Sequence, residues 1–593
     1  MDVLGISCYF HDAAAALLRD GQLVAAAEEE RFTRKKHDYD FPQRAIDFCL
    51  AAGGIRGSAL DWVVFFEKPF VKFERLLLTS LQTFPRSHRV FREAMISWLA
   101  DKLWVKDLIR KRLGVPAARI LFSEHHLSHA ASAFYCSPHE EAAILTIDGV
   151  GEWATASLGI GRGTEIKLVK EIRFPHSLGL LYSAFTAFLG FEVNEGEYKV
   201  MGMAPFGAPR YREKVEKLIR TNDDGSFELD MSYFSFHYSP DRSFNGKFVE
   251  LFGPPRDHGT LFFTPSSGYP SYFGKKPANY DELAQQNQHY ADVAASIQAV
   301  TEEVMLRMAR AAHRETGLRK LCLAGGVALN SVGNGRILRE ALFDEIYIQP
   351  AAGDSGGALG AALYGYHGIL GKPRRFVLEH AYWGKDHGPD AIEAFLKDNG
   401  IRYEKATDDE VLITRVVDRL QGGRVVGWFQ GRFEWGPRSL GNRSILADPR
   451  KAEMKDIVNT KIKFREPYRP FAPSVLLDKT DDFFELAEPS RHYPARFMLY
   501  VVRVREDKRE VIPAVTHVDG TARLQTVDRS TAPRYYHLIQ RFGEATGVPL
   551  LLNTSFNLRG EPIVNTPAEA FATFNKSDMD VLVLDRYIVE KKR

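Results

Sequence analysis

The stretch EAAILTIDGVGEWATASLGIGRGTEIKLVKEI, residues 141–172, decides the fold. Its three apolar runs are separated by an Asp-Gly loop and a Gly-rich turn, which predicts three consecutive strands. The first thirty residues have the same pattern, because VLGISCY (3–9) predicts a strand and AAAALLRDGQLVAAAEEER (13–31) predicts a hairpin with an Asp-Gly turn. We therefore expect one α/β unit built twice, with a cleft between the halves that favours ligand binding.

Two later strands of the second half each run into glycines. KLCLAGGVALNSVGNGRI (320–337) and DEIYIQPAAGDSGGALGAALYG (344–365) both predict a strand, a glycine loop and a helix, and the apolar spacing of 291–317 predicts a long helix before them. A strand–glycine–helix junction exposes backbone N–H groups and a helix dipole to phosphate. The alternative is that these glycines only permit tight turns, and neither stretch matches GxGxxG or the P-loop pattern.

The composition excludes several classes of protein. A chain of 593 residues is too long for one hydrophobic core, and its 78 Lys and Arg nearly balance its 76 Asp and Glu, which disfavours a dedicated nucleic-acid or membrane-surface binder. The four cysteines have no CxxC spacing, the start lacks a signal-peptide pattern, and no apolar run is long enough to span a membrane. We expect a soluble, cytoplasmic protein with no membrane partner and no nucleic-acid partner.

A change of character near residue 370, at GILGKPRRF (368–376), predicts a domain boundary. After it, residues 421–470 hold eleven Lys or Arg against five Asp or Glu. A run of basic residues is usually a solvated surface. Here the basic residues alternate with glycines, prolines and aromatics, which favours a loop-built pocket where arginines bind phosphate in a bidentate manner.

The segment FSEHHLSHAASAFY (122–135) predicts a helix with Ser123 as its N-cap. His125 and His129 are four residues apart and lie on one face of that helix, so the pair could chelate one metal ion. An isolated pair of this kind is as often a surface feature or a satisfied core feature. The HExxH motif of metalloproteases is absent, because His126 follows His125.

Two aspartates are candidate partners of these histidines. Asp148 ends an apolar strand and Asp354 ends the 344–353 segment, so both are expected at the rim of the cleft. A mixed nitrogen and oxygen site suits iron, manganese or zinc and leaves positions for substrate. His11, in the first loop, is a candidate general base because imidazole titrates near neutrality, although a lone histidine can equally be a capping or packing residue.

Ten motifs, in this order, resemble the O-carbamoyltransferases of antibiotic and nodulation-factor biosynthesis. They are HDAAAAL, EHHLSHAASAF, LTIDGVGEWAT, GEYKVMGMAPFG, LAGGVALN, AAGDSGGALGAA, GRFEWGPRSLGNRSILADPR, KFREPYRPFAP, HVDGTARLQTV and NTSFNLRGEPIV, and they cover nearly the full chain. The resemblance implies an α/β protein with a duplicated actin/sugar-kinase-like ATPase fold over residues 1–370, similar to the tRNA threonylcarbamoyl-transfer subunit. A smaller α/β domain that forms carbamoyl-adenylate is implied over residues 371–593.

The resemblance also implies roles for single residues. The implied metal ligands are His125, His129, Asp148 and Asp354, and the implied nucleotide-binding residues are Gly149, Gly325, Gly326, Asn330 and Asp354. His11 is implied as the base for the acceptor hydroxyl. The implied ligands of carbamoyl phosphate and the adenylate are Lys463, Arg465, Arg523, Asn553 and Ser555, with Arg438 and Arg469 in the same pocket. The expected metal is Fe²⁺, with Mn²⁺ or Zn²⁺ as alternatives, and ATP with Mg²⁺ is the expected co-substrate.

The expected activity is transfer of the carbamoyl group of carbamoyl phosphate, through carbamoyl-AMP, to a hydroxyl of a small natural product of secondary metabolism. A dianion with a labile acyl–phosphate bond needs several cations to position it in a water-poor pocket. Two alternatives remain open: an ATP-dependent small-molecule kinase on the same N-terminal fold, and a nucleic-acid-associated protein akin to the tRNA modifiers. The balanced charge disfavours the latter.

Overall fold

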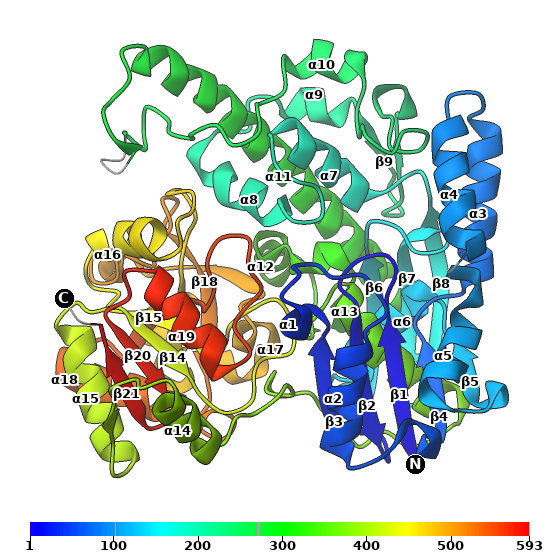
Figure 1. The fold of residues 1–593 in the computed structure, drawn as a ribbon. Helices are drawn as coiled ribbons and strands as arrows, with labels where there is room; N and C mark the ends of the chain where they lie inside the picture. The colour runs from blue at the N-terminus through cyan, green and yellow to red at the C-terminus, as the bar shows by residue number, and fades with distance from the viewer. Residues whose placement is uncertain (101, 270–272, 592–593) are drawn as a thin grey trace. The chain divides into compact units, whose positions relative to one another are not determined.

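The computed structural model describes residues 1–100, 102–269 and 273–591 (Figure 1). It contains two compact units. The first consists of Met1–Glu29, His37–Tyr269 and Lys275–Leu378, and the second consists mainly of Glu30–Lys36 and the chain from Glu379 onward. None of the helices in the described ranges combines the length and the hydropathy that crossing a lipid bilayer requires.

The first unit contains two five-stranded sheets with the same strand order. In the first sheet β1, β2 and β3 are consecutive antiparallel neighbours, and β4 and β5 continue in parallel from the other edge of β1. In spatial order its strands are β3 (Gln22–Glu28), β2 (Ala14–Arg19), β1 (Asp2–Ser7), β4 (Trp62–Phe65) and β5 (Ile120–Phe122). Asp20 and Gly21 both have positive φ in the turn between β2 and β3, as a tight hairpin requires.

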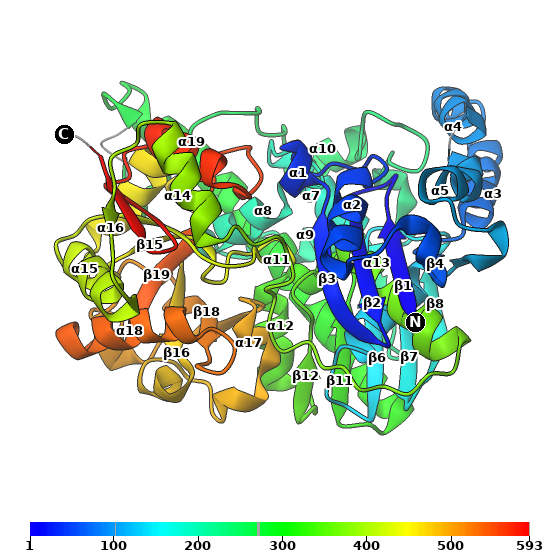
Figure 2. The same cartoon turned by 60° about the horizontal axis from the view of Figure 1, so that its bottom comes forward.

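The second sheet repeats this arrangement (Figure 2). Its antiparallel series is β6, β7 and β8, and two strands run parallel to β6 on its other edge. In spatial order its strands are β12 (Glu345–Tyr347), β11 (Lys320–Ala324), β6 (Glu141–Ile147), β7 (Ala154–Arg162) and β8 (Glu165–Arg173). The predicted duplication of one α/β unit is therefore confirmed.

Two helices pack against each other between these sheets. α13 (Asp354–Leu363) contacts β1, β2 and β4, whereas α6 (His125–Phe134) contacts β6, β7 and β11. A side chain at Gly360 would collide with the carbonyl oxygen of Ser128 on α6, and one at Gly5 of β1 would collide with the carbonyl of Ala358. Glycine is required at both positions because backbone approaches backbone there.

A long helix, α11 (Tyr280–Thr316), ends at Gly317 in the left-handed conformation, as the sequence predicts, but it begins earlier than expected. The remaining helices and short strands of the first unit are α2 (Gln43–Gly53), α3 (Pro69–Gln82), α4 (His88–Ala100), α5 (Val105–Leu113), α7 (Leu178–Phe188), α8 (Glu197–Met203), α9 (Arg212–Glu216), β9 (Ile219–Thr221), β10 (Phe227–Leu229), α10 (Gly246–Phe252) and α12 (Ser331–Glu340). Near the C-terminal end of the first unit, Arg374 donates hydrogen bonds to the carbonyls of Phe134, Ser137 and His139. These bonds hold the last segment of the unit against the rest of it.

The second unit is built on one mixed sheet. In spatial order its strands are β13 (Glu404–Lys405), β21 (Tyr587–Glu590), β20 (Val581–Leu584), β14 (Val426–Phe429), β15 (Arg443–Ala447), β19 (Leu550–Ser555), β16 (Ala472–Leu476), β18 (Thr521–Val527) and β17 (Tyr500–Arg503). Its helices are α1 (Glu30–Thr33), α14 (Pro389–Asp398), α15 (Asp409–Gln421), α16 (Glu453–Ile457), α17 (Tyr493–Arg496), α18 (Pro533–Thr546) and α19 (Pro567–Lys576). Apolar residues of α15 and α18 form one core with Trp428 and other residues of the sheet.

A short piece of the N-terminal chain belongs to this second unit. Arg31, which is almost fully buried, donates a hydrogen bond of 2.7 Å to the carbonyl oxygen of Gly436. Arg34 donates hydrogen bonds of 2.7 Å to the carbonyls of Pro562 and Ile563. The chain therefore leaves the first unit after Glu29, contributes these two arginines to the second, and returns at His37.

Candidate metal centre and anion-binding site

Two histidines and two aspartates converge in the first unit. Nε2 of His125 and Nε2 of His129, one turn apart on α6, lie 3.0 Å from each other. Oδ2 of Asp148, directly after β6, lies 3.2 Å from Nε2 of His125, and Oδ1 of Asp354, the first residue of α13, lies 3.4 Å from Nε2 of His129. All four side chains are buried, and one nitrogen or oxygen from each lies within 4.8 Å of the others.

The loops at the ends of β6 and β11 hold Asp148 in this place. The backbone N–H of Gly326 donates a hydrogen bond of 2.7 Å to Oδ1 of Asp148, which leaves Oδ2 facing the histidines. Gly325, with a φ of 95°, passes so close to the backbone of Ile147 that no side chain fits there. Because the two strands are parallel, their carboxyl ends meet at one edge of the sheet, and the chemistry gathers at that edge.

The atoms that converge in this cluster fit a metal ion. Nε2 of His125 and Nε2 of His129 face each other and the carboxylate oxygens of Asp148 and Asp354, at distances of 3.0 to 3.8 Å. Two imidazole nitrogens and two carboxylate oxygens pointing at one another form a donor set that suits Fe²⁺, Mn²⁺ or Zn²⁺. Among the described residues, Oδ2 of Asp354 is also buried without a hydrogen-bond partner, whereas buried polar atoms are normally paired.

The electrostatics of the cluster also favour a bound cation. Burial lowers the pKa of His125, but Asp354 and Asp148 outweigh it and raise that pKa to about 10. Burial likewise opposes the shift at Asp148, where the two histidines lower the pKa well below its usual range. The carboxylate of Asp148 therefore stays ionised and contributes a negative field in which a cation is favoured.

A carboxylate that sequence reasoning missed holds the start of α6. Glu152 accepts hydrogen bonds from the backbone N–H of His125 at 3.0 Å and of Lys68 at 2.8 Å. The prediction that Ser123 is the N-cap was wrong: Glu124 occupies that position and makes no capping hydrogen bond with its side chain. Glu152 can replace a local cap because the loop after β6 brings it to the N-terminus of the helix.

A second missed carboxylate, Glu67, lies behind His125. Its Oε2 is 2.6 Å from Nζ of Lys72 and 3.8 Å from Nδ1 of His125, and all three side chains are buried. Burial raises the pKa of Glu67, but Lys72 and His125 outweigh it and lower that pKa to about 2. Glu67 is therefore an anion next to the imidazole of His125.

His11 lies in a separate cluster of the first unit. Its Nδ1 is 2.7 Å from Oδ2 of Asp12, and its Nε2 is 3.0 Å from the carbonyl oxygen of Asn194. The other oxygen of Asp12 is 2.8 Å from Nδ1 of His37. Burial lowers the pKa of His11, but Asp12 outweighs it and, with a smaller contribution from Asp354, raises that pKa to about 10. Asp12 thus fixes the ring so that Nε2 faces away from it.

Most of the predicted nucleotide-binding residues surround Asp148. Gly325 and Gly326 adjoin it, an added Cβ on Gly149, the next residue, would meet no atom within 4 Å, and the 353–354 loop lies beside Gly326. Asn330 has a different role, because its Oδ1 caps α12 by accepting the N–H of Gly333 at 3.0 Å.

The second unit gathers the predicted cations. Lys463, at the end of a π-helical turn, is buried and donates through Nζ to the carbonyls of Ser555 at 2.6 Å and Asn557 at 2.8 Å. Burial, then Arg465 and Arg469, hold the pKa of Lys463 well below its usual range.

Arg523 on β18 lies in the same field of positive charge. Burial, then Arg438, Arg465 and Arg469, hold the pKa of Arg523 well below its usual range. A group of cations that depress one another's pKa in this way is stabilised by a bound anion. The unit therefore brings together Lys463 and all four predicted arginines.

The two predicted polar residues of this site differ in their surroundings. Ser555 is half-buried and its Oγ lies 3.2 Å from Nζ of Lys463. Asn553 is buried, and its Nδ2 donates to Ser474 at 3.0 Å and to Gln525 at 2.9 Å. Asn553 thus ties β19 to its neighbour β16 and to β18, the strand beyond β16.

Not all basic residues of 421–470 are available to bind an anion. Oε1 of Glu434 accepts the N–H groups of Leu440 and Asn442 at 2.8 Å, which fixes the loop that carries Arg438. Arg443 is fully buried and donates to the carbonyls of Gln430 and Gly431. Arg443 is therefore a structural residue.

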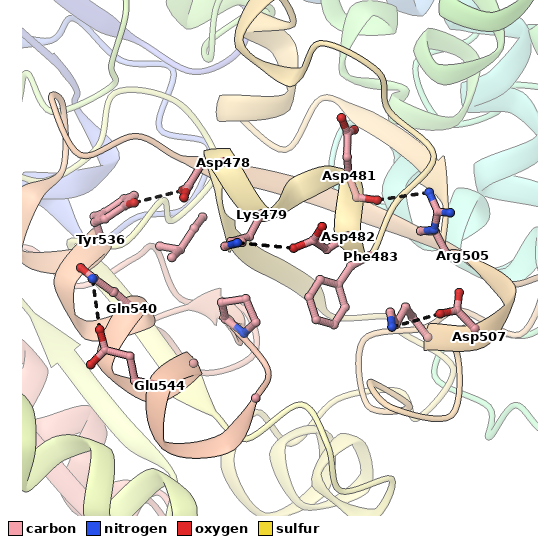
Figure 3. A pocket seen from close by; sticks show the side chains of 15 residues that line it. Asp478, Lys479, Asp481, Asp482, Phe483, Arg505, Asp507, Tyr536, Gln540 and Glu544 are labelled. Atoms are coloured by element: carbon pink, nitrogen blue, oxygen red, sulfur yellow. Dashed lines mark hydrogen bonds and ion pairs between the residues drawn. The ribbon is translucent and has the colours of Figure 1, made fainter.

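A groove of about 780 Å³ in the second unit contains none of the predicted residues. Its charged side chains form pairs with one another, such as Asp478 with Tyr536, Lys479 with Asp482, and Asp507 with Lys508 (Figure 3). These pairs leave little charge for a ligand, and we assign the groove no role in the reaction.

Comparison with known proteins gives the family. The family model described as the carbamoyltransferase N-terminus matches residues 2–363, and the model of the carbamoyltransferase C-terminus matches residues 417–591. The chain belongs to the carbamoyltransferase family. The expected family and the expected class of enzyme are thereby confirmed.

Two relatives of this carbamoyltransferase match over nearly its full length, and a third matches over about half of it. An uncharacterised Synechocystis protein, sll1178, is 48% identical over 99% of this chain and 96% of its own. The nodulation protein NolNO of Sinorhizobium fredii is 41% identical over 98% of this chain and 79% of its own. The 3'-hydroxymethylcephem-O-carbamoyltransferase of Streptomyces clavuligerus is 35% identical over 46% of this chain and 49% of its own.

Among solved structures, a ROK hexokinase from Thermus thermophilus matches the carbamoyltransferase with a TM-score of 0.30 and 14% identity, over 63% of this chain and 100% of that one. The strand order, rather than this distant likeness, defines the duplicated fold of the first unit.

Proposed function

We propose that the enzyme is an ATP-dependent O-carbamoyltransferase with two active sites. In this proposal residues 371–593 make carbamoyl-AMP, and residues 1–370 transfer its carbamoyl group to a hydroxyl. The observation that carries the proposal is the gathering of Arg438, Arg465 and Arg469 around the buried Arg523, because a phosphate dianion is the ligand that such a group of arginines stabilises best.

In the proposed first reaction, water cleaves carbamoyl phosphate to carbamate and phosphate. A carbamate oxygen then attacks the α-phosphorus of ATP, the bond to the β-phosphate oxygen breaks, and pyrophosphate leaves. Arg523, Arg465 and Lys463 would hold the negative charge in place, so that no solvent reorganisation is needed as charge develops. The proposed further ligands are Arg438, Arg469, Ser555 and Asn553. The hydrogen bond from Asn553 to Ser474 on β16 holds that side chain in place.

In the proposed second reaction, the acceptor hydroxyl oxygen attacks the carbamoyl carbon and the bond from that carbon to AMP breaks. The hydroxyl proton passes to Nε2 of His11 in its neutral form, which the raised pKa of about 10 makes the minor form at neutral pH. Asp12 supports this role because it binds Nδ1 and leaves Nε2 as the reactive nitrogen. Nε2 donates to the carbonyl oxygen of Asn194 at 3.0 Å, and the acceptor hydroxyl would have to replace this contact.

A divalent ion held by His125, His129, Asp148 and Asp354 would polarise a carbonyl or phosphate oxygen as a Lewis acid. Of the candidate ions we propose Fe²⁺, with Mn²⁺ and Zn²⁺ as alternatives, and Mg²⁺ as the ion that accompanies ATP. The loops of Gly149, Gly325 and Gly326, with Asn330 behind them, would cradle the nucleotide at the edge of the sheet.

The proposed acceptor is a small hydroxylated natural product of secondary metabolism. Support comes from the Streptomyces clavuligerus relative, whose name assigns it O-carbamoyl transfer to 3'-hydroxymethylcephem. That relative shares 35% identity over 46% of this chain.

One assay tests the proposal. The protein is incubated with ATP, Mg²⁺ and carbamoyl phosphate, and pyrophosphate is measured. We expect pyrophosphate release that depends on carbamoyl phosphate. Formation of ADP instead would indicate the kinase, and salt-sensitive retention of RNA without turnover would indicate the nucleic-acid-associated protein.

A further inference from the structure

Glu67 is a buried anion to which the proposed reactions assign no role. It follows β4 directly, its side chain is only 3% exposed, and its partner Lys72 on α3 is 4% exposed. A buried ion pair alone adds little to stability, because the cost of removing both charges from water offsets their attraction. The place of this pair, behind His125, indicates a role in the metal centre.

The two ring nitrogens of His125 face different groups. Nε2 faces His129, Asp148 and Asp354, which are the other proposed ligands. Nδ1 faces Glu67, whose Oε2 is 3.8 Å away, and within the described part of the chain Nδ1 has no hydrogen-bond partner. A movement of about 1 Å would bring these two atoms to hydrogen-bond length.

Histidines that bind metals through one nitrogen usually donate the other N–H to a carboxylate, a carbonyl or water. That hydrogen bond fixes which nitrogen carries the proton, and so which nitrogen is available to the ion. Glu67 is a carboxylate in the right position for this role at His125. Glu152 holds the backbone N–H of the same residue at 3.0 Å, so that the main chain and the ring are both constrained.

We propose that Glu67 is a positioning residue of the metal centre. It accepts the Nδ1–H of His125, fixes the tautomer that presents Nε2 to the ion, and is itself held in place by Lys72, whose Nζ is 2.6 Å from Oε2. The inference rests on the proposed function, because it takes the two histidines and two aspartates to be a metal site.

The test measures metal affinity in the full-length protein. Metal-free wild type and the Glu67→Gln variant are titrated with Zn²⁺ in competition with a chromophoric chelator, and bound zinc is counted at saturation. Glutamine keeps the size of the side chain but cannot carry the negative charge. We expect the affinity to fall about 10- to 100-fold, with the number of bound ions unchanged at saturation.

Glu124→Gln is the matched control. Glu124 is the adjacent residue to His125 in the chain, but its side chain is 53% exposed and pairs with Lys68 at 2.8 Å. We expect this control to bind zinc as the wild type does. A second variant, Lys72→Met, is expected to weaken binding as Glu67→Gln does, because Glu67 loses the ammonium group that holds its carboxylate at 2.6 Å behind His125.

The outcomes separate the inference from the proposed function. Wild-type affinity in Glu67→Gln would overturn the inference, and if that variant does not fold, wild-type affinity in Lys72→Met would do so. A wild-type protein that binds no zinc stoichiometrically would instead overturn the proposed metal site itself. Circular dichroism of the metal-free variants establishes that they are folded.

Discussion

Two imidazole nitrogens at hydrogen-bond distance need a proton or a cation between them. Nε2 of His125 and Nε2 of His129 are 3.0 Å apart, and the carboxylates of Asp148 and Asp354 adjoin both. A divalent ion would replace the proton and satisfy all four side chains. We expect metal binding to release protons, and the affinity to fall at acidic pH for that reason.

The first prediction at this scale concerns His129→Ala. We expect the variant to lose its stoichiometric metal, measured by elemental analysis, because one of four ligands is removed. Pyrophosphate release dependent on carbamoyl phosphate should stay within about twofold of wild type, since the catalytic groups proposed for that step are elsewhere. His126→Asn is the control, because His126 binds Thr146 at 2.7 Å and is outside the cluster. Loss of pyrophosphate release together with the metal in a well-folded His129→Ala would contradict the assignment of the two reactions to different units.

Arg523→Ala should have the opposite effect. We expect pyrophosphate release to fall about 100-fold or more, because a charge that stabilises the reacting phosphate is lost, while the metal content is unchanged. The matched control is Arg503→Ala on the neighbouring strand β17, where the side chain is exposed. Equal losses of pyrophosphate release in Arg523→Ala and Arg503→Ala would mean that Arg523 contributes only to the overall positive charge of the unit and makes no specific contact with phosphate.

The pKa of His11 gives a prediction about pH. Its value of about 10 is above the ordinary value, so the stabilisation that the imidazolium provides is complete below about pH 6.5 and is lost as the pH rises toward 10. Asp12→Asn removes the carboxylate that raises this pKa. We therefore expect the free energy of unfolding to decline less between neutral pH and pH 10 in the variant than in wild type. Urea denaturation at several pH values measures this, with the exposed Asp47→Asn as control. Parallel curves for wild type and Asp12→Asn would refute it.

At the scale of elements, the packing of α6 against α13 sets the geometry of the metal centre. The histidines are on α6 and Asp354 begins α13, so the distance between these helices controls the distance between the ligands. Gly360 permits the close approach, because a side chain there would meet the carbonyl oxygen of Ser128.

The Gly360→Val variant tests this dependence. We expect a loss of stability of about 1–3 kcal/mol in thermal or urea unfolding, as is usual for overpacking. We also expect weaker zinc binding, because the helices must move apart. Gly246→Ala is the control within the same unit, since a Cβ there meets no atom within 4 Å. Unchanged zinc affinity in a destabilised Gly360→Val would show that the centre does not depend on this packing.

At the scale of the whole molecule, two compact units carry two kinds of site. The first gathers carboxylates and imidazoles, which favour a cation, and the second gathers arginines and a lysine, which favour an anion. Opposite electrostatics of this kind suit two different half-reactions.

Removal of the metal should therefore separate the two reactions. After treatment with a strong chelator, dialysis and resupply of Mg²⁺ alone, we expect pyrophosphate release dependent on carbamoyl phosphate to persist at near wild-type rate. The bound transition metal should be absent by elemental analysis, and thermal stability should fall because the ligand no longer stabilises the folded state. If pyrophosphate release disappears together with the metal, the first half-reaction needs that ion as well.

The sequence predicts what depends on local pattern. The repeated strand pattern predicted the duplicated fold, and the four-residue spacing of His125 and His129 predicted that the two rings share a face. It could not predict Glu67 or Glu152, because a single glutamate carries no spacing signal and its contact with His125 exists only in the folded chain. The N-cap predicted at Ser123 was wrong for the same reason, because the contact of Glu152 with the start of α6 exists only in the folded chain.

The segment from Glu30 to Lys36 has a practical consequence for anyone who wishes to dissect the protein. A gene cut near residue 370 would yield a C-terminal fragment without Arg31 and Arg34, whose guanidinium groups bind the carbonyls of Gly436, Pro562 and Ile563. Those carbonyls would be stripped of their donors, and the fragment would aggregate or unfold more readily. Separate production of the two halves therefore calls for a peptide of residues 30–36 supplied in trans or grafted onto the C-terminal piece.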